Sequence, residues 1–249
     1  MNKKALSIVS LVTFALVLLV NAISAFGLFG VTPVKDISDR LTNLLVPMGY
    51  TFSVIWTVIY AGLIYYTVKE LVRKEDKYDN GLLFILTNVL NILWIITFTL
   101  KMYLISTLII AALLLALYIL TTRIEDNNLD KIIFSVYTAW ILVATAVSIE
   151  SFIVSLGITP FDSAFMKLVT ILLTVGTTIV ILINKDNLAM KITYIFSLIG
   201  ILANHVVKFD FAYLDLMVIV AIVAAFVLYS LLYELFKDNS GEVKHSEAI

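Results

Sequence analysis

The stretch Pro47-Met-Gly-Tyr-Thr-Phe-Ser-Val-Ile-Trp-Thr-Val-Ile-Tyr60 begins in a polar loop and runs directly into an apolar helix. Pro47 precedes the predicted helix, where its fixed φ and missing N–H are tolerated. Inside the helix Phe52, Trp56 and Tyr60 recur every four residues, so their rings fall on one face. The stretch therefore predicts a helix with an aromatic face. Such a face is found both in ordinary core packing and in aromatic binding pockets, and the spacing alone does not distinguish these two roles.

Composition places the chain in a membrane. Of its 249 residues 61% are hydrophobic and 14% are charged, whereas a soluble domain carries about a quarter charged residues. The apolar residues fall in blocks of about 20, the length that crosses a hydrocarbon core of about 30 Å. These blocks lack the alternation of apolar and polar residues that marks the strands of a membrane barrel. We predict an all-α polytopic membrane protein.

Eight apolar blocks are long enough to span a bilayer. They cover residues 5–26, 50–68, 81–100, 103–122, 132–156, 164–184, 188–207 and 213–236. The first block is longer than the apolar core of a signal peptide, so we expect it to remain as a membrane helix. The polar residues 237–249 are expected to form a disordered tail.

The distribution of lysine and arginine orients the spans. With the N-terminus inside, the outer segments hold Lys35, Arg40, Lys101, Lys167 and Lys208. The other lysines and arginines, more than twice as many, then lie in the inner segments. By the positive-inside rule this bias predicts cytoplasmic N- and C-termini and an even number of spans. Missing organelle-targeting features and a composition rich in lysine and isoleucine favour the plasma membrane of a bacterium or archaeon.

Residues 27–49 form the longest loop between predicted spans. Within it Ile37, Leu41, Leu44 and Leu45 recur at helical spacing, with charged residues between them. This pattern predicts a short amphipathic helix lying at the membrane surface. An ordinary connector is the alternative interpretation.

Several function classes lose support from the sequence. Cysteine is absent, which excludes disulfides, thiolate nucleophiles and Cys-type zinc or iron–sulfur sites. A formal net charge of −1, without a dense Lys/Arg block, does not favour nucleic-acid binding. The signature motifs of metalloproteases, α/β-hydrolases, P-loop enzymes and dinucleotide-binding enzymes are missing. We therefore expect no enzyme, no catalytic residue and no metal site, with His205 as the single candidate for an axial haem ligand within a span.

Two further spans carry polar and aromatic side chains along one face. These faces hold Thr87, Asn91, Trp94 and Phe98 in the third span, and Tyr137, Trp140, Ala144 and Ser148 in the fifth. An amide in hydrocarbon needs a hydrogen-bonding partner, so we expect Asn91 to face the interior of the bundle. Its partner there could be a neighbouring helix or a bound ligand.

Taken together, the three stretches resemble the tryptophan-rich sensory protein family, also called the translocator protein or peripheral benzodiazepine receptor family. The family motifs have the forms Pro-x-Gly-aromatic-x-Phe-x-x-x-Trp-Thr-x-x-Tyr, Asn-x-x-Trp and Tyr-x-x-Trp-x-x-x-Ala. The matching residues are Pro47, Gly49, Tyr50, Phe52, Trp56, Thr57, Tyr60, Asn91, Trp94, Tyr137, Trp140 and Ala144. The family has Gln at Thr87, Pro at Val136 and Asn near Ser148, so this chain lacks two amides and a kink. These departures concern the ligand chemistry, not the fold.

The resemblance covers roughly residues 5–156 and implies a five-helix translocator-protein-like bundle whose mouth is covered by the first loop as a lid. About three additional transmembrane helices follow. The resulting division is a five-helix membrane domain, 1–156, an appended three-helix segment, 157–236, and the tail, 237–249. Gly200 and Ala203, in the seventh span, offer a face of small residues for close packing.

The resemblance also implies a membrane receptor or sensor with an aromatic-lined pocket for planar hydrophobic ligands, with or without their transport. Family ligands are porphyrins, sterols and benzodiazepine-like compounds, and bacterial members are linked to tetrapyrrole sensing or stress regulation. The ligand-binding residues implied are Tyr50, Trp56, Tyr60, Asn91, Trp94, Tyr137 and Trp140. A porphyrin or haem would be a ligand, not a resident cofactor. The expected partners are the lipid bilayer and this small molecule, and a homodimer is compatible with the family.

Glu150 is the most deeply placed ionisable residue in the fifth span. On a helical wheel it points about 120° away from the face of Tyr137 and Trp140, so we do not expect it to line the same pocket. We predict that it pairs with Lys167 or His205 and so ties the first five helices to the last three. A proton relay is the alternative, and it would make the protein a proton-coupled secondary transporter. An accessory subunit of a larger membrane complex is the remaining class.

Overall fold

A computed structural model describes residues 3–41, 43–73, 80–125, 128–158, 164–209 and 213–246, with side chains described as far as residue 237. Eight of its helices are long and apolar enough to cross a membrane. They are α1 (Lys3–Phe26), α3 (Gly49–Val72), α4 (Gly81–Thr99), α5 (Tyr103–Thr122), α6 (Leu129–Ser155), α7 (Ala164–Ile183), α8 (Leu188–Phe209) and α9 (Leu214–Ser246). Each begins within three residues of its predicted start. The predicted class, an all-α polytopic membrane protein, is confirmed.

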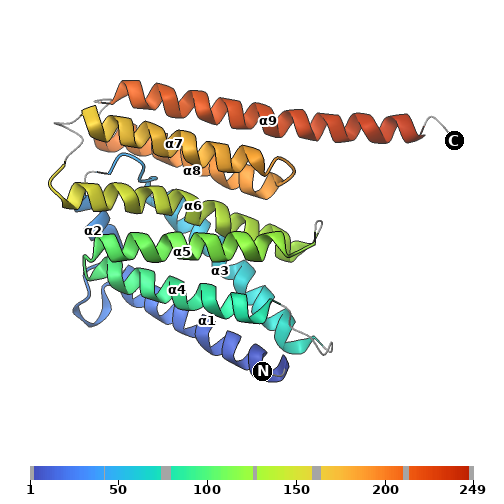
Figure 1. Ribbon diagram of the computed structural model, residues 1–249, viewed down its shortest axis with the longest axis horizontal. Helices are drawn as coiled ribbons and strands as arrows, with labels where there is room; N and C mark the ends of the chain where they lie inside the picture. Colours follow the sequence, from blue (N-terminus) through green and yellow to red (C-terminus); the bar gives the residue numbers. More distant parts are fainter. Residues whose placement is uncertain are drawn as a thin grey trace.

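The first five long helices enclose one hydrophobic core. Helices α1, α4, α5 and α6 contact one another in that order, and α3 packs against both α1 and α6 (Figure 1). Apolar and aromatic side chains from all five helices meet inside, among them Phe14, Leu63, Phe84, Leu113 and Phe134. Burial of these large side chains is the main favourable contribution to their packing. The arrangement is the five-helix bundle that the motifs implied.

A second core lies on the opposite face of α6. There Ala139, Leu142 and Val143 of α6 pack with Tyr194 of α8 and Val227 of α9. Figure 1 shows α7, α8 and α9 stacked on the side of α6 that faces away from α1. Because α6 contributes side chains to both cores, 72% of its most apolar 18-residue stretch is buried, the largest share among the eight spans. The last three helices are therefore packed on the first five through α6.

The first loop contains the predicted amphipathic helix, α2 (Val34–Arg40), which follows a short 3₁₀ turn, η1 (Leu28–Gly30). Ile37 and Leu41 pack against Phe98 at the end of α4. The helix thus covers the end of the bundle at which α3 begins, which we call the α2 end (Figure 1).

The prediction that one amphipathic helix contains all four apolar loop residues is wrong for Leu44 and Leu45, which lie beyond its end. Leu44 and Leu45 follow the end of α2 and are 0% and 3% exposed. Leu45 joins the second core, and Leu44 packs against Tyr213 and Leu216. The segment 43–48 leaves the surface because helices offer its leucines apolar burial and its backbone hydrogen-bond partners.

Gly200 brings the start of α3 close to α8. A Cβ at Gly200 would lie 2.4 Å from Oγ1 of Thr51, so only glycine fits between the two helices. The backbone N–H of Met48 donates to the Gly200 carbonyl oxygen at 2.9 Å. The face of small residues noted in the seventh span is thus used for contact with the first bundle.

The start of α1 and the end of α9 lie at the same end of the molecule, opposite α2, which we call the terminal end (Figure 1). Helix α9 continues to Ser246, where the sequence predicted a disordered tail from residue 237. Extending an existing helix costs little compared with nucleating a new one, which accounts for the additional turns. Residues 247–249 of the predicted tail lie outside the described residues.

Candidate functional site

Trp56 of α3 is the centre of an aromatic cluster inside the first bundle. Its ring is stacked with those of Tyr60 and Trp94, at centroid distances of 5.2 and 6.3 Å. Tyr137 and Trp140 of α6 meet it edge-on at 6.1 and 6.4 Å. Both arrangements are favoured by the charge distribution of aromatic rings. Three helices thus bring five of the seven predicted site residues together, as the family resemblance implied.

Asn91 is fully buried beside this cluster and joins three helices. Its carbonyl oxygen accepts a hydrogen bond from Nδ2 of Asn21 on α1 at 2.8 Å. Its own Nδ2 donates to the hydroxyl of Tyr137 on α6 at 2.9 Å. The interior position expected for Asn91 is therefore found, with both groups engaged by neighbouring helices. Sequence reasoning missed Asn21, although a lone amide in the first span was the signal that could have found it.

Tyr50 is the predicted site residue that lies apart from the cluster. It stands at the start of α3 with 49% of its side chain exposed. Among the described residues it makes no ring contact with Trp56, whose aromatic neighbours all come from deeper positions. Phe52 occupies that place instead, 6.1 Å from Trp56 and 5.7 Å from Trp140. The role of Tyr50 as a stacking residue stays a prediction.

The indole nitrogens of the cluster lack acceptors. Nε1 of Trp56, Trp94 and Trp140 is buried, and none of the three donates a hydrogen bond to a described residue. More than about 90% of buried polar groups in proteins have a partner, because an unmade bond costs free energy. Three unpaired donors within one ring cluster are therefore the feature of this site that most needs a function.

A groove beside the cluster opens on the outside of the bundle between α3 and α6. Its volume is about 210 Å³. Its lining is apolar, formed by Val58, Ile59, Gly62 and Tyr65 on α3 and Leu129, Ile132, Ile133 and Val136 on α6. The tryptophans do not line it, and their rings fill the interior one turn away along α3. A planar molecule reaching the indoles from the lipid would therefore displace side chains at this groove.

The predicted pairing of Glu150 with Lys167 or His205 is wrong. Glu150 is 0% exposed, and its Oε2 accepts from the backbone N–H of Leu45 at 2.9 Å. Its Oε1 accepts from the hydroxyl of Thr170 on α7 at 2.6 Å. The link between α6 and the last three helices exists, but a hydroxyl provides it.

The residues expected to pair with Glu150 have other partners. Lys167 extends from the exposed start of α7 to Asp215 of α9, with 2.8 Å between Nζ and Oδ2. Nε2 of His205 donates to the carbonyl oxygen of Leu44 at 2.8 Å. The imidazole of His205 is therefore hydrogen-bonded to the backbone of the buried segment 43–46, and not to Glu150 as predicted.

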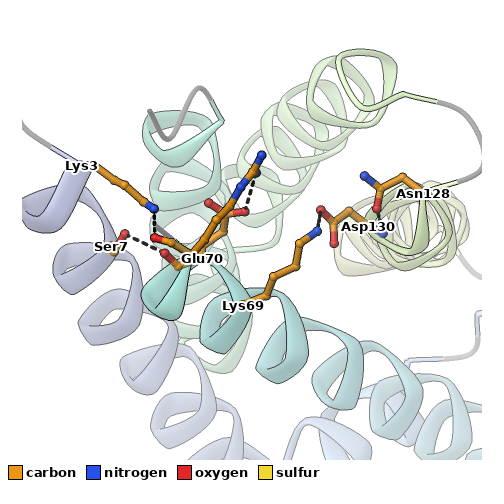
Figure 2. A network of polar contacts seen from close by, with 7 residues as sticks. Lys3, Ser7, Lys69, Glu70, Asn128 and Asp130 are labelled. Atoms are coloured by element: carbon orange, nitrogen blue, oxygen red, sulfur yellow. Dashed lines mark hydrogen bonds and ion pairs between the residues drawn. The ribbon is translucent and has the colours of Figure 1, made fainter. Parts of the chain in front are cut away.

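A polar network closes the terminal end of the first bundle (Figure 2). Lys69 on α3 pairs with Asp130 on α6, with 2.6 Å between Nζ and Oδ2. The hydroxyl of Ser7 on α1 donates to the carbonyl oxygen of Glu70 at 3.3 Å, and the Glu70 carboxylate pairs with Arg73. These contacts fasten α1 and α6 to the end of α3. Among the described residues no group of three His, Asp or Glu could hold a metal ion.

Fold and site together define a polytopic helical membrane protein with an aromatic cluster in its first bundle. The family model described as TSPO-like protein matches residues 7–233, and the chain belongs to this family. The match extends beyond residue 156, where the motif resemblance ended, and runs through the last three spans. Neither a search of curated proteins nor a search of solved structures found a match.

We expect Asn91→Leu to lower the free energy of unfolding by about 2–3 kcal/mol. The substitution keeps the side-chain size but leaves the Asn21 amide and the Tyr137 hydroxyl without partners inside the bundle. Thermal unfolding of the protein in detergent measures the effect. Asn184→Leu is the control, because Asn184 directly follows α7 and its amide donates to the Val180 carbonyl of that helix. Equal losses in the two variants would contradict the role assigned to Asn91.

Proposed function

We propose that this protein is a membrane receptor or sensor that binds planar hydrophobic molecules of the porphyrin or sterol type within the aromatic cluster. Membership of the TSPO-like family supports a sensing or binding role in the membrane in general terms. The three unpaired indole donors support the ligand class, because a rigid ring system with carboxylate or carbonyl groups offers both stacking surface and acceptors.

The proposed binding mode assigns different roles to the parts of the cluster. The parallel rings of Trp56, Tyr60 and Trp94 would stack on the ligand plane, while Trp140 would approach its edge. Indole N–H groups would donate to the ligand's acceptors. Asn91 would contribute only if a ligand replaced Asn21 as the partner of its carbonyl oxygen. Access from the lipid would be along the groove between α3 and α6.

The same proposal includes the finer points of location and partners. We infer a plasma-membrane protein with both termini cytoplasmic, in line with the Lys/Arg bias and with termini at one end. Its proposed partners are the lipid bilayer, a planar ligand and a second copy of the chain. We infer binding, with or without transport, and no chemical conversion of the ligand.

The test is quenching of tryptophan fluorescence by protoporphyrin IX in detergent. The variant Trp56→Phe/Trp140→Phe keeps an aromatic ring at each position and retains Trp94 as the reporter, but removes two indole donors. We expect saturable quenching of the unmodified protein, and about a tenfold weaker affinity in the variant, because two hydrogen bonds contribute about 1–3 kcal/mol together.

Tyr229→Phe, on the exposed face of α9, is the control for general changes in the micelle. Linear quenching without saturation, equal in all three proteins, would mean that porphyrin only partitions into the detergent. That result would overturn the ligand class while leaving the fold and the family unaffected.

A further inference from the structure

Glu150 is a carboxyl group inside the membrane-spanning part of α6 whose hydrogen-bond partners are neutral. They are the hydroxyl of Thr170 and the backbone N–H groups of Leu45 and Leu44. No cation pairs with Glu150 among the described residues. An uncompensated carboxylate at this depth is costly, and taking up a proton removes the cost.

The hydroxyl of Thr170 can satisfy both protonation states of Glu150. Its oxygen lies 2.6 Å from Oε1 of Glu150 and 2.9 Å from the carbonyl oxygen of Met166. When Glu150 is charged, the hydroxyl donates to Oε1. When Glu150 carries a proton on Oε1, that proton is donated to the Thr170 oxygen and the hydroxyl turns to Met166. The N–H of Leu45 donates to Oε2 in both states, so no heavy atom needs to move.

The titratable and charged groups on the elements around Glu150 are already paired. They are Lys167 of α7 with Asp215 of α9, Lys208 of α8 with Asp39 of α2, and His205 of α8, whose ring meets that of Tyr213 edge-on. Nε2 of His205 donates to the Leu44 carbonyl oxygen, and so does not reach Glu150. A negative charge on Glu150 would therefore be neutralised by a bound proton and not by a cationic side chain.

Further hydroxyl groups follow Thr170 along α7 in the second core, and that of Thr174 donates to the Thr170 carbonyl oxygen. A cavity of about 10 Å³ lies beside these hydroxyls, and its lining is mostly apolar, with Thr174, Thr177 and Tyr194 as its polar residues. The hydroxyl of Tyr194 is 2.8 Å from that of Thr177 and 2.9 Å from that of Thr178. Lys191 lies one turn from Tyr194 along α8, on the side of the terminal end. It is buried, and its Nζ donates to Ser230 and Glu234 of α9.

We propose that Glu150 is a proton-binding site within the membrane, and that the hydroxyls around Tyr194 exchange its proton with the terminal end. Hydronium at that end gives up a proton and becomes water, and an O–H bond forms at Oε1 of Glu150. The buried carboxyl, the two-way hydroxyl of Thr170 and the hydroxyls of α7 and α8 support the proposal together. It is independent of ligand binding at the aromatic cluster.

The test is infrared difference spectroscopy of the full chain in lipid nanodiscs during a pH titration. We expect a carboxylic C=O band that grows as the pH falls and is missing in Glu150→Gln. The band should persist in Asp215→Asn. This control removes an exposed carboxylate at the start of α9, which lies at the α2 end of the molecule. A band unchanged in Glu150→Gln would overturn the proposal.

Thr170→Val and Thr170→Ser test the site even if Glu150→Gln does not fold. Valine removes the donor to the charged form and the acceptor of the neutral form. Because the bond to the charged form is the stronger of the two, the titration midpoint should rise by about one pH unit, a tenfold higher proton affinity. Serine keeps the hydroxyl and should keep the midpoint. Equal midpoints in the two variants would overturn the role of the hydroxyl and with it the site.

Tyr194→Phe tests the path. Its neighbours Thr177 and Thr178 retain hydrogen bonds to carbonyl groups of α7, so the fold should persist. After a pH jump the Glu150 band should appear about tenfold more slowly, with an unchanged midpoint. An unchanged rate would overturn the proposed exchange along these hydroxyls.

Discussion

Glu234→Gln is expected to lower the free energy of unfolding by about 3 kcal/mol. The Nζ of Lys191 lies 2.5 Å from Oε2 of Glu234, with 0% of the lysine side chain and 21% of the glutamate side chain exposed. Glutamine keeps an acceptor but removes the negative charge, so the ammonium group enclosed between α8 and α9 is left without a counter-charge. A broken buried pair costs about 3–5 kcal/mol, and the partial exposure of Glu234 places this one at the lower end.

The double variant Lys191→Met/Glu234→Gln is expected to recover most of that loss. Methionine fills the space of the lysine stem and brings no charge, so nothing buried remains unpaired. Thermal unfolding of the four proteins of this cycle in detergent gives the coupling energy of the pair.

The pair Lys167–Asp215 is the matched control for this cycle. It also joins neighbouring helices of the second core, with 2.8 Å between nitrogen and oxygen, but both side chains are substantially exposed. An exposed pair contributes about 1 kcal/mol or less, so Asp215→Asn should have little effect. Similar losses from Glu234→Gln and Asp215→Asn would show that Lys191 is not enclosed as the structure has it.

The spans could be predicted because each depends on local sequence. An apolar block of about 20 residues must form its backbone hydrogen bonds internally, and this makes a helix. The positions of Trp56 and Tyr60 relative to each other followed from the same geometry. Thus the helices and the aromatic face of α3 were accessible from the sequence.

The partners of buried polar groups could not be predicted in the same way. The positive-inside rule counted Lys191 among the residues of an inner loop, yet its long side chain reaches a carboxylate 43 positions away. The partner of Glu150 includes the backbone of Leu45, and a backbone group carries no sequence signal. Which side chains pair across helices depends on how each helix is rotated and on where the loops run. Hydrophobicity and spacing along the sequence determine neither of these.

For Asn91 the local sequence pattern predicted the position of the side chain but not its hydrogen-bond partner. Its interior position followed from the cost of an amide in hydrocarbon. Its partner on α1, Asn21, lies 70 positions away in the chain and belongs to no recognised motif. The exposed position of Tyr50 was missed for the opposite reason, since it matches the motif but stands at the helix start, beyond the cluster.

Gly200→Ala is expected to lower the free energy of unfolding by about 1–3 kcal/mol through overpacking. The new Cβ would lie 2.4 Å from Oγ1 of Thr51, 2.8 Å from its Cγ2 and 2.9 Å from its Cβ. Rotation of the Thr51 side chain relieves the first two contacts but not the third, because the Cβ position is fixed by the backbone of α3. Helix α8 must therefore move away from α3, which also lengthens the 2.9 Å hydrogen bond from Met48 to Gly200.

Gly176→Ala is the matched control, because a Cβ at Gly176 meets no atom within 4 Å on α7. The better helix propensity of alanine should make this change neutral or stabilising by up to about 1 kcal/mol. Combining Gly200→Ala with Thr51→Ala removes the two closest contacts and should restore part of the loss, which thermal unfolding of the single and double variants measures. Should Gly200→Ala prove as harmless as Gly176→Ala, α3 and α8 would not touch at Gly200. A loss rescued by Thr51→Ala would instead place a direct contact between the two bundles there, in addition to the packing that they share through α6.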